Sequence, residues 1–250
     1  MTRGCRIYIF ALWMLCLGMA FSPSAFSDCP AGDLSGDCVV DMSDLLIFAD
    51  SWLNPFQPVH EGLVARWRLD ASEGETAAED ISGYTGQLHG EPQWMPGWGK
   101  YQGALSFDGI DDYVEAVGFK GITGGASRTC SAWINTDKVT GEIITWGNNN
   151  AGGTKWVVRV DESGALRAEV YYGYIVGTTL INDGEWHHVI AQADRASKKL
   201  TIYTDGKEDK SGVGIDRGLS LENSSNLYVG GTPSGRYFKG TFEFLRICLG

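Results

Sequence analysis

A short acidic stretch near the N-terminus has the residue types and spacing of a calcium site. Side-chain and backbone oxygens recur at alternate positions there, where a tight loop can point them at one centre. The candidate ligands are Asp33, Ser35, Asp37, the backbone carbonyl of Val39, Asp41 and Asp44. Calcium takes roughly six to eight oxygen ligands, and such a loop followed by a helix can supply them. The stretch therefore predicts a calcium site, and calcium is the cofactor that we expect.

Two residues of this loop depart from the usual pattern. Cys38 stands where a glycine would relieve the sharp turn, and Asp44 reaches less far than the glutamate that normally closes such a loop. A disulfide between Cys29 and Cys38 is expected and could hold the turn instead. The alternative interpretation is a solvated acidic turn in which Ser43 or Asp44 caps the following helix.

The first residues are typical of a secretory signal peptide. Arg3 and Arg6 precede an apolar run over residues 7–21, and residues 25–27 offer a small-x-small cleavage pattern. We expect residues 1–27 to be the signal peptide and the mature protein to be secreted, either extracellular or in the cell envelope. No membrane span is expected after signal removal. A retained N-terminal anchor is the alternative.

The charge balance excludes some partners. The chain has 20 Lys+Arg and 31 Asp+Glu residues, and two of the basic residues lie in the signal peptide. The remainder therefore has 18 basic against 31 acidic residues, a net charge near −13. Such a surface repels nucleic acid and anionic lipid, so we expect neither as a partner. Calcium and neutral glycans suit it better.

The rest of the chain divides into a small and a large part. Residues 28–53 contain the acidic loop and a short amphipathic helix, and residues 54–61, with two prolines, form a linker. From residue 62 to residue 250 the sequence changes to short runs rich in Val, Ile, Tyr, Trp and Thr, separated by Gly, Asp and Asn. This pattern predicts an all-β domain, a two-sheet antiparallel sandwich with one core.

Six segments of the large part carry a family resemblance. In order they are EGLVARWRLD, GALSFDGIDDYVEA, TCSAWINT, GEWHHVIAQAD, KLTIYTDGKE and GTFEFLRI. They resemble, in the same order, the characteristic segments of laminin-G-like domains, over about residues 62–248. This resemblance implies a concanavalin A-like jelly roll. Such domains usually continue past the last strand. A truncated C-terminus and a less protected final strand are therefore one expectation.

The acidic loop resembles a single dockerin type I calcium repeat. The combination of this repeat with a jelly roll resembles secreted proteins of planctomycete-type bacteria. A full dockerin has two repeats that present paired helices to a cohesin. A single repeat makes a cohesin-like partner one option, and a structural or surface-attachment role competes with it.

Two further sites are candidates in the large domain. Asp108, Asp111 and Asp112 surround a glycine turn, so they are either hairpin-turn residues or a second calcium site. An aromatic platform for sugar rings is the other candidate. Its residues are Trp146 and Trp156 and the segment 171–177 with Tyr172 and Tyr174. Asn148, Asn149 and Asn150, in the loop after Trp146, could fix the sugar hydroxyls. The alternative for the tryptophans is a place in the core.

Two pairs of residues are interpreted structurally. His187 and His188 alternate along a strand, so their rings should point to opposite faces and cannot share a metal. Cys130 and Cys248 lie in apolar strand-like segments, where buried thiols and a second disulfide are both open.

No catalytic motif is recognisable. The paired carboxylates that jelly-roll glucanases carry as E-x-D-x-x-E are absent, as are HExxH, a nucleophile elbow and a phosphate-binding glycine loop. We therefore expect a secreted, non-catalytic binding module for carbohydrate or a cell-surface partner, with glycan or extracellular protein as the ligand. The alternatives are a scaffolding protein attached through the dockerin-like segment and an unrecognised glycoside hydrolase.

Overall fold

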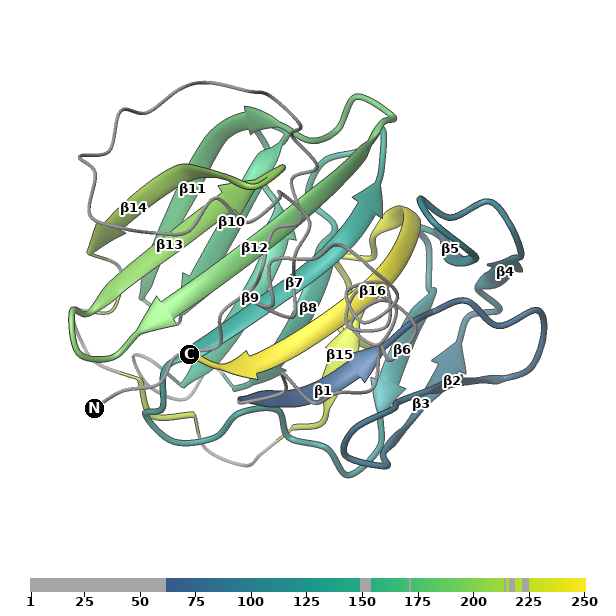
Figure 1. Cartoon of the computed structure of the whole chain (residues 1–250), viewed down its shortest axis with the longest axis horizontal. Coiled ribbons are helices and arrows are strands. Elements are labelled where there is room, and N and C mark those ends of the chain that lie inside the picture. The colour runs from purple at the N-terminus through teal and green to yellow at the C-terminus, as the bar shows by residue number, and fades with distance from the viewer. Residues whose placement is uncertain (1–61, 149–153, 171, 214, 216–218, 222–224) are drawn as a thin grey trace, which may run out of the picture. The chain divides into compact units, whose positions relative to one another are not determined.

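The large domain is a two-sheet antiparallel sandwich, as the sequence predicted (Figure 1). A computed structural model describes residues 62–148, 154–170, 172–213, 215, 219–221 and 225–250. These residues contain sixteen strands and no helix, and therefore no helix that could span a membrane. The jelly-roll fold class is confirmed.

Sheet A has eight described strands. Their order is β14-β13-β12-β7-β16-β5-β4, and β1 pairs with β16 beside this path. The strands are β1 (Leu63–Trp67), β4 (Gln93–Met95), β5 (Ala104–Asp108), β7 (Arg128–Asn135), β12 (Trp186–Asp194), β13 (Lys199–Thr204), β14 (Lys207–Val213) and β16 (Lys239–Leu249).

Sheet B also has eight described strands, in the order β11-β10-β9-β8-β15-β6-β3-β2. The strands are β2 (Thr76–Ala78), β3 (Thr85–His89), β6 (Tyr113–Ala116), β8 (Glu142–Gly147), β9 (Lys155–Val160), β10 (Ala165–Val170), β11 (Gly173–Leu180) and β15 (Leu227–Val229).

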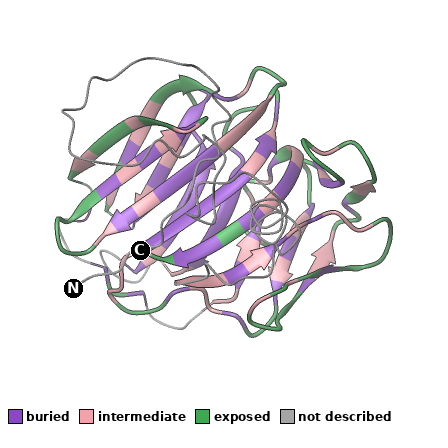
Figure 2. Cartoon of the chain, in the orientation of Figure 1, coloured by how far each residue is buried: buried purple, intermediate pink, exposed green. Residues whose placement is uncertain are grey.

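The core lies between the two sheets. Alternate residues of each strand point inward, which follows from the two-residue side-chain period of a strand. The largest apolar side chains in it are almost fully buried: Trp67, Trp146, Trp156, Phe107, Phe238 and Phe242. Figure 2 shows buried residues concentrated on the central strands and exposed ones on the loops and on β14.

The last strand is central in its sheet. β16 pairs with β7 along one side and with β5 and β1 along the other. Backbone groups on both sides of β16 are therefore hydrogen-bonded within the sheet. The expectation of a less protected final strand is wrong.

The two cysteines of the domain form no disulfide. On the paired strands β7 and β16, Cys130 lies opposite Ile247 and Cys248 lies opposite Thr129. The two cysteines are therefore one position away from being directly opposite each other. Directly paired residues project to the same face and adjacent ones to opposite faces. Cys130 therefore points into the core and Cys248 away from it, which excludes a bond between them. Burial raises the pKa of the Cys130 thiol to about 12.

The edges of the two sheets are joined at β11 and β14. Asp209 of β14 accepts hydrogen bonds from the backbone N–H of Thr178, at 3.0 Å, and from its hydroxyl, at 2.7 Å. Thr179 N–H also donates to it, at 3.2 Å. These bonds satisfy edge groups of β11 that would otherwise be open to another strand.

The predictions for the N-terminal quarter lie outside the described residues. They are the signal peptide, the calcium loop with its ligands from Asp33 to Asp44, the following helix, the linker and the Cys29–Cys38 disulfide.

Candidate functional site on the outer face of sheet B

One row of side chains crosses the outer face of sheet B from strand to strand. Because paired residues share a face, the strand register places these side chains side by side, away from the core. From one edge of the row toward the other, its members are Tyr174, Glu169, Val157, Thr145, Tyr228, Glu115 and Gln87. Tyr174 and Tyr228 are four strands apart, a distance of about 19 Å. We call this row, together with Tyr113, Glu142, Arg159 and Arg167 on the same side of the sheet, the sheet B face. Val157 and Thr145, in the middle of the row, are buried.

One end of the sheet B face is aromatic. Tyr113 stacks on His89 with ring centroids 4.5 Å apart and meets Tyr228 edge-on at 6.0 Å. Tyr237 lies 6.4 Å from Tyr113. Burial, with the nearby Glu115 carboxylate, raises the pKa of both Tyr113 and Tyr228, so their hydroxyls remain protonated donors at neutral pH. The cluster combines flat rings with polar tips.

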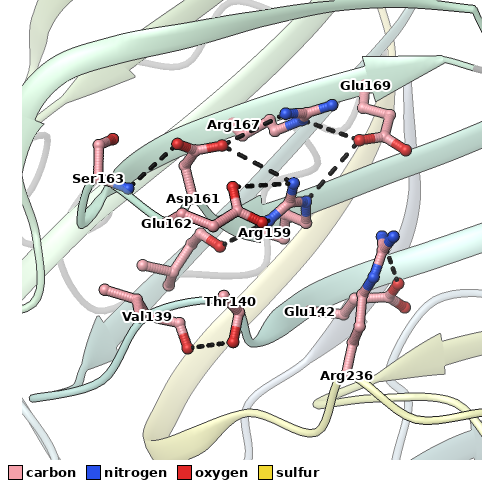
Figure 3. A network of polar contacts seen from close by, with 11 residues as sticks. Val139, Thr140, Glu142, Arg159, Asp161, Glu162, Ser163, Arg167, Glu169 and Arg236 are labelled. Atoms are coloured by element: carbon pink, nitrogen blue, oxygen red, sulfur yellow. Dashed lines mark hydrogen bonds and ion pairs between the residues drawn. The ribbon is translucent and has the colours of Figure 1, made fainter.

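The middle of the sheet B face is charged. Figure 3 shows the Arg159 guanidinium between acidic side chains. Its Nη1 lies 3.3 Å from Glu162 Oε1, and its Nε lies 3.7 Å from Glu169 Oε2. Arg167 Nε donates to the same Glu169 oxygen at 2.8 Å, and Arg167 Nη1 lies 3.3 Å from Asp161 Oδ2.

Two buried polar atoms in this middle part have no hydrogen-bond partner among the described residues. They are Oε2 of Glu142 and Nε of Arg159. Both residues are only 4% exposed. The nearest cation to Glu142 is Arg236, whose Nη1 lies 3.6 Å from Oε1 (Figure 3). Burial raises the pKa of Glu142, against the attraction of Lys155 and Arg236. Unpartnered buried polar atoms in a native protein call for an explanation.

At the other end of the sheet B face, an arginine guanidinium lies over the ring of an exposed tyrosine. The Arg167 guanidinium lies 3.6 Å from the ring centre of Tyr174, which is 56% exposed. Tyr172 is exposed as well. These two tyrosines were proposed from the sequence as ligand-binding residues, and both are accessible to a ligand.

The domain matches one family along more than half of the chain. Residues 108–248 match the profile of the concanavalin A-like lectin/glucanases superfamily, in its laminin-G form. The chain belongs to this superfamily. Members with this fold include both binding and catalytic proteins, so membership alone assigns no activity. No curated protein matches the sequence significantly.

Solved structures show the same fold. Domain 4 of AbnA, a GH43 extracellular arabinanase from Geobacillus stearothermophilus, was solved with arabinotriose. It is similar with a TM-score of 0.59 and 16% identity, over 76% of this chain and 93% of that one. The binding domain of Paraclostridial Mosquitocidal Protein 1 has a TM-score of 0.58 and 13% identity, over 75% of this chain and 49% of that one.

A sialidase is also similar. The Trypanosoma rangeli enzyme, solved with sialic acid, matches with a TM-score of 0.54 and 16% identity, over 75% of this chain and 30% of that one. At such identities the three similarities show the fold alone.

The tryptophan platform does not form, and both tryptophans take the alternative place in the core. Trp146 and Trp156 are 1% and 0% exposed, and their rings pack against each other with centroids 6.0 Å apart. A bulge at Glu142 sets the side-chain alternation of β8, so that Trp146 shares the inner face with Ile144. Trp146 is therefore a core residue, and its Nε1 donates to Ile122 O at 3.1 Å. Asn148 is half-buried, and its backbone N–H donates to Thr154 O at 2.9 Å.

The three acidic residues after β5 come together. Asp108, Asp111 and Asp112 each bring one carboxylate oxygen within 4.8 Å of the others. Asp108 N–H donates to Asp112 Oδ2 at 2.8 Å, and Ile110 N–H donates to Asp108 Oδ1 at 2.7 Å. Some of their oxygens therefore have turn-forming roles.

The two histidines of β12 point to opposite faces. His187 pairs with Ile134 on the core side, and His188 pairs with Trp133 on the outer side, with ring centroids 5.1 Å apart. His187 Nδ1 lies 2.8 Å from Asp205 Oδ2, and its Nε2 lies 3.1 Å from Asp183 Oδ1. Both ring nitrogens of His187 have carboxylate partners, which gives it a structural role.

Most residues of the sheet B face were not singled out from the sequence. The signal that could have found them is alternation within single strands. In β6 the residues Tyr113 and Glu115 alternate with buried apolar ones, and in β10 Arg167 and Glu169 do the same. Which strands lie side by side cannot be read from that alternation.

Proposed function

We propose that this protein is a secreted, non-catalytic binding module that recognises carbohydrate through the sheet B face. The observation that supports it is a pair of buried polar atoms, Glu142 Oε2 and Arg159 Nε, that make no hydrogen bond among the described residues and lie on strands between the two aromatic ends. A sugar hydroxyl can donate to the first and accept from the second. Tyrosine rings can stack against the C–H faces of the sugar on either side.

The composition of the sheet B face fits a neutral glycan. Its arginines are already matched by carboxylates, because Arg159 and Arg167 both contact acidic residues. A strongly acidic sugar would have to displace these ion pairs. The fold of an arabinanase domain that was solved with arabinotriose supports a sugar ligand, without specifying it.

Gel electrophoresis with soluble neutral polysaccharides in the gel, arabinan among them, tests this proposal. Binding should retard the protein, and Tyr228→Ala and Glu142→Gln should each abolish the retardation. Tyr203→Ala is the matched control, because Tyr203 lies on the outer face of sheet A. Retardation that persists in both sheet B variants would refute the proposal.

One observation favours a second candidate, a glycoside hydrolase. Burial raises the pKa of Glu142, and a glycosidase needs a carboxylic acid that keeps its proton near neutral pH. Release of reducing sugar by the purified protein, abolished by Glu142→Gln, would establish this activity. Binding without sugar release supports the non-catalytic module.

Calcium binding by the loop from Asp33 to Asp44 and secretion complete the proposal, on the strength of the sequence. The partner of the dockerin-like segment would be an extracellular, cohesin-like protein. Isothermal titration with calcium after chelator treatment should show binding that is lost in the Asp33→Ala/Asp37→Ala double variant. Calcium-dependent capture of a protein partner without glycan binding would support the scaffolding alternative.

A further inference from the structure

The turn between β5 and β6 concentrates negative charge in a small volume. Asp108, Asp111 and Asp112 lie within five residues, and one carboxylate oxygen of each lies within 4.8 Å of the other two. Three like charges at this separation repel one another unless a cation or protons neutralise them.

Turn geometry accounts for only part of this arrangement. Asp108 Oδ1 and Asp112 Oδ2 accept backbone N–H groups and so hold the turn. Asp112 Oδ1 has no partner in the part of the chain that the structure describes, although Asp112 is only 3% exposed. A hairpin turn has no need of a buried, unpaired carboxylate oxygen. This atom is the independent sign of a missing ligand.

The charges around Asp112 agree with this interpretation. Asp108 and Asp111 each bring a carboxylate oxygen within 4.8 Å of one of its oxygens, and burial without a cation disfavours the ionised form of a carboxylate. A cation among the three carboxylates would reverse the effect of burial and favour the ionised form.

We propose that Asp108, Asp111 and Asp112 bind one calcium ion at the β5–β6 turn, separate from the loop at residues 33–44. Calcium–oxygen distances are about 2.3–2.6 Å, so two ligands of one ion are separated by at most about 5 Å. The three carboxylate oxygens all lie within 4.8 Å of one another, inside this limit. Calcium is favoured over magnesium because it accepts an irregular oxygen set with water completing the shell.

The test uses the full chain with Asp33→Ala and Asp37→Ala, which removes the N-terminal loop as a competing site. After chelator treatment, isothermal titration with calcium chloride should show one bound ion. Adding Asp111→Asn should weaken the affinity at least 10-fold. Asp137→Asn, at an exposed aspartate elsewhere in the domain, is the matched control and should leave it unchanged. No binding in the parent, or equal binding in both variants, would overturn the proposal.

Thermal melting gives a second test. A purely structural effect of the substitution would not reverse the order of the two melting temperatures between chelator and calcium. In chelator, Asp111→Asn should melt at or above the temperature of its parent, because one of three repelling charges is removed. In calcium the order should reverse, since only the parent is stabilised by the ion. A calcium-induced rise in melting temperature that is equal in both proteins would contradict the site. Neither readout depends on glycan binding.

Discussion

Glu142 and Arg159 face each other directly across β8 and β9, yet no hydrogen bond joins their side chains among the described residues. Arg159 instead forms ion pairs with Glu162, Asp161 and Glu169. Among the described residues, Arg236 is the cation that lies nearest Glu142, with Nη1 3.6 Å from Oε1. The pair therefore leaves a buried acceptor and a buried donor side by side, in the middle of a face with tyrosines at both ends.

Glu142→Gln should stabilise the protein at neutral pH while abolishing the retardation by glycan. The raised pKa of Glu142 means that its ionised form costs folding free energy above the unfolded pKa, on the order of 1 kcal/mol for a buried unpaired group. Melting temperature at pH 7 should rise by roughly 2–4 °C. The difference should shrink as pH falls through 4.5 and vanish below it, because the unfolded carboxyl then becomes protonated too. A stabilisation that is independent of pH would contradict this assignment.

His187 should make stability fall as pH rises. Burial alone would lower its pKa, but hydrogen bonds to Asp205 and Asp183 raise it above 6.5. The protonated form is therefore favoured in the folded state, and its stabilisation is complete below pH 6.5 and lost above it. The melting temperature should fall by roughly 2–4 °C between pH 6 and pH 9, for about 1 kcal/mol. His187→Gln should flatten this dependence, and an unchanged pH profile would refute it.

Glu243→Ala should destabilise the domain strongly. This residue of β16 is fully buried, and its carboxylate accepts the backbone N–H groups of Tyr101 at 3.0 Å and Gln102 at 2.9 Å. Removing it leaves two donors without a partner, a loss of about 2–4 kcal/mol. Urea denaturation measures the change. Glu243→Gln, which keeps one acceptor oxygen, should lose less.

The control for that experiment is Glu185→Ala, at an exposed glutamate in the loop before β12. It should change the free energy of unfolding by less than about 0.5 kcal/mol. If Glu243→Ala lowers the free energy of unfolding by no more than this, the segment at Tyr101 and Gln102 is held by other contacts and the prediction is wrong.

The fold could be predicted from the sequence because alternation within each strand is a local signal. The run from Leu166 to Val170 buries alternate residues against the core and leaves Arg167 and Glu169 between them half-buried on the other side. The position of Trp146 could not be predicted, because one bulge in β8 decides which face its side chain takes.

The sheet B face was missed for a related reason. Tyr174 and Tyr228 come from strands far apart in the sequence, and the strand order of sheet B brings them into one row. Strand order and register are set by packing of the whole core. Asp108, Asp111 and Asp112 were found because they lie within a single turn, where spacing along the chain alone predicts proximity.

Binding of neutral polysaccharide by Tyr228→Ala, compared with Tyr203→Ala, tests the central claim most directly. Both variants remove one half-buried tyrosine from an outer sheet face, but only Tyr228 belongs to the sheet B face. The protein and Tyr203→Ala should be retarded by at least one polysaccharide of the panel, and Tyr228→Ala should migrate as in a plain gel. Equal retardation of the two variants, or no retardation of the protein by any polysaccharide, would contradict the assignment of this face as a glycan site.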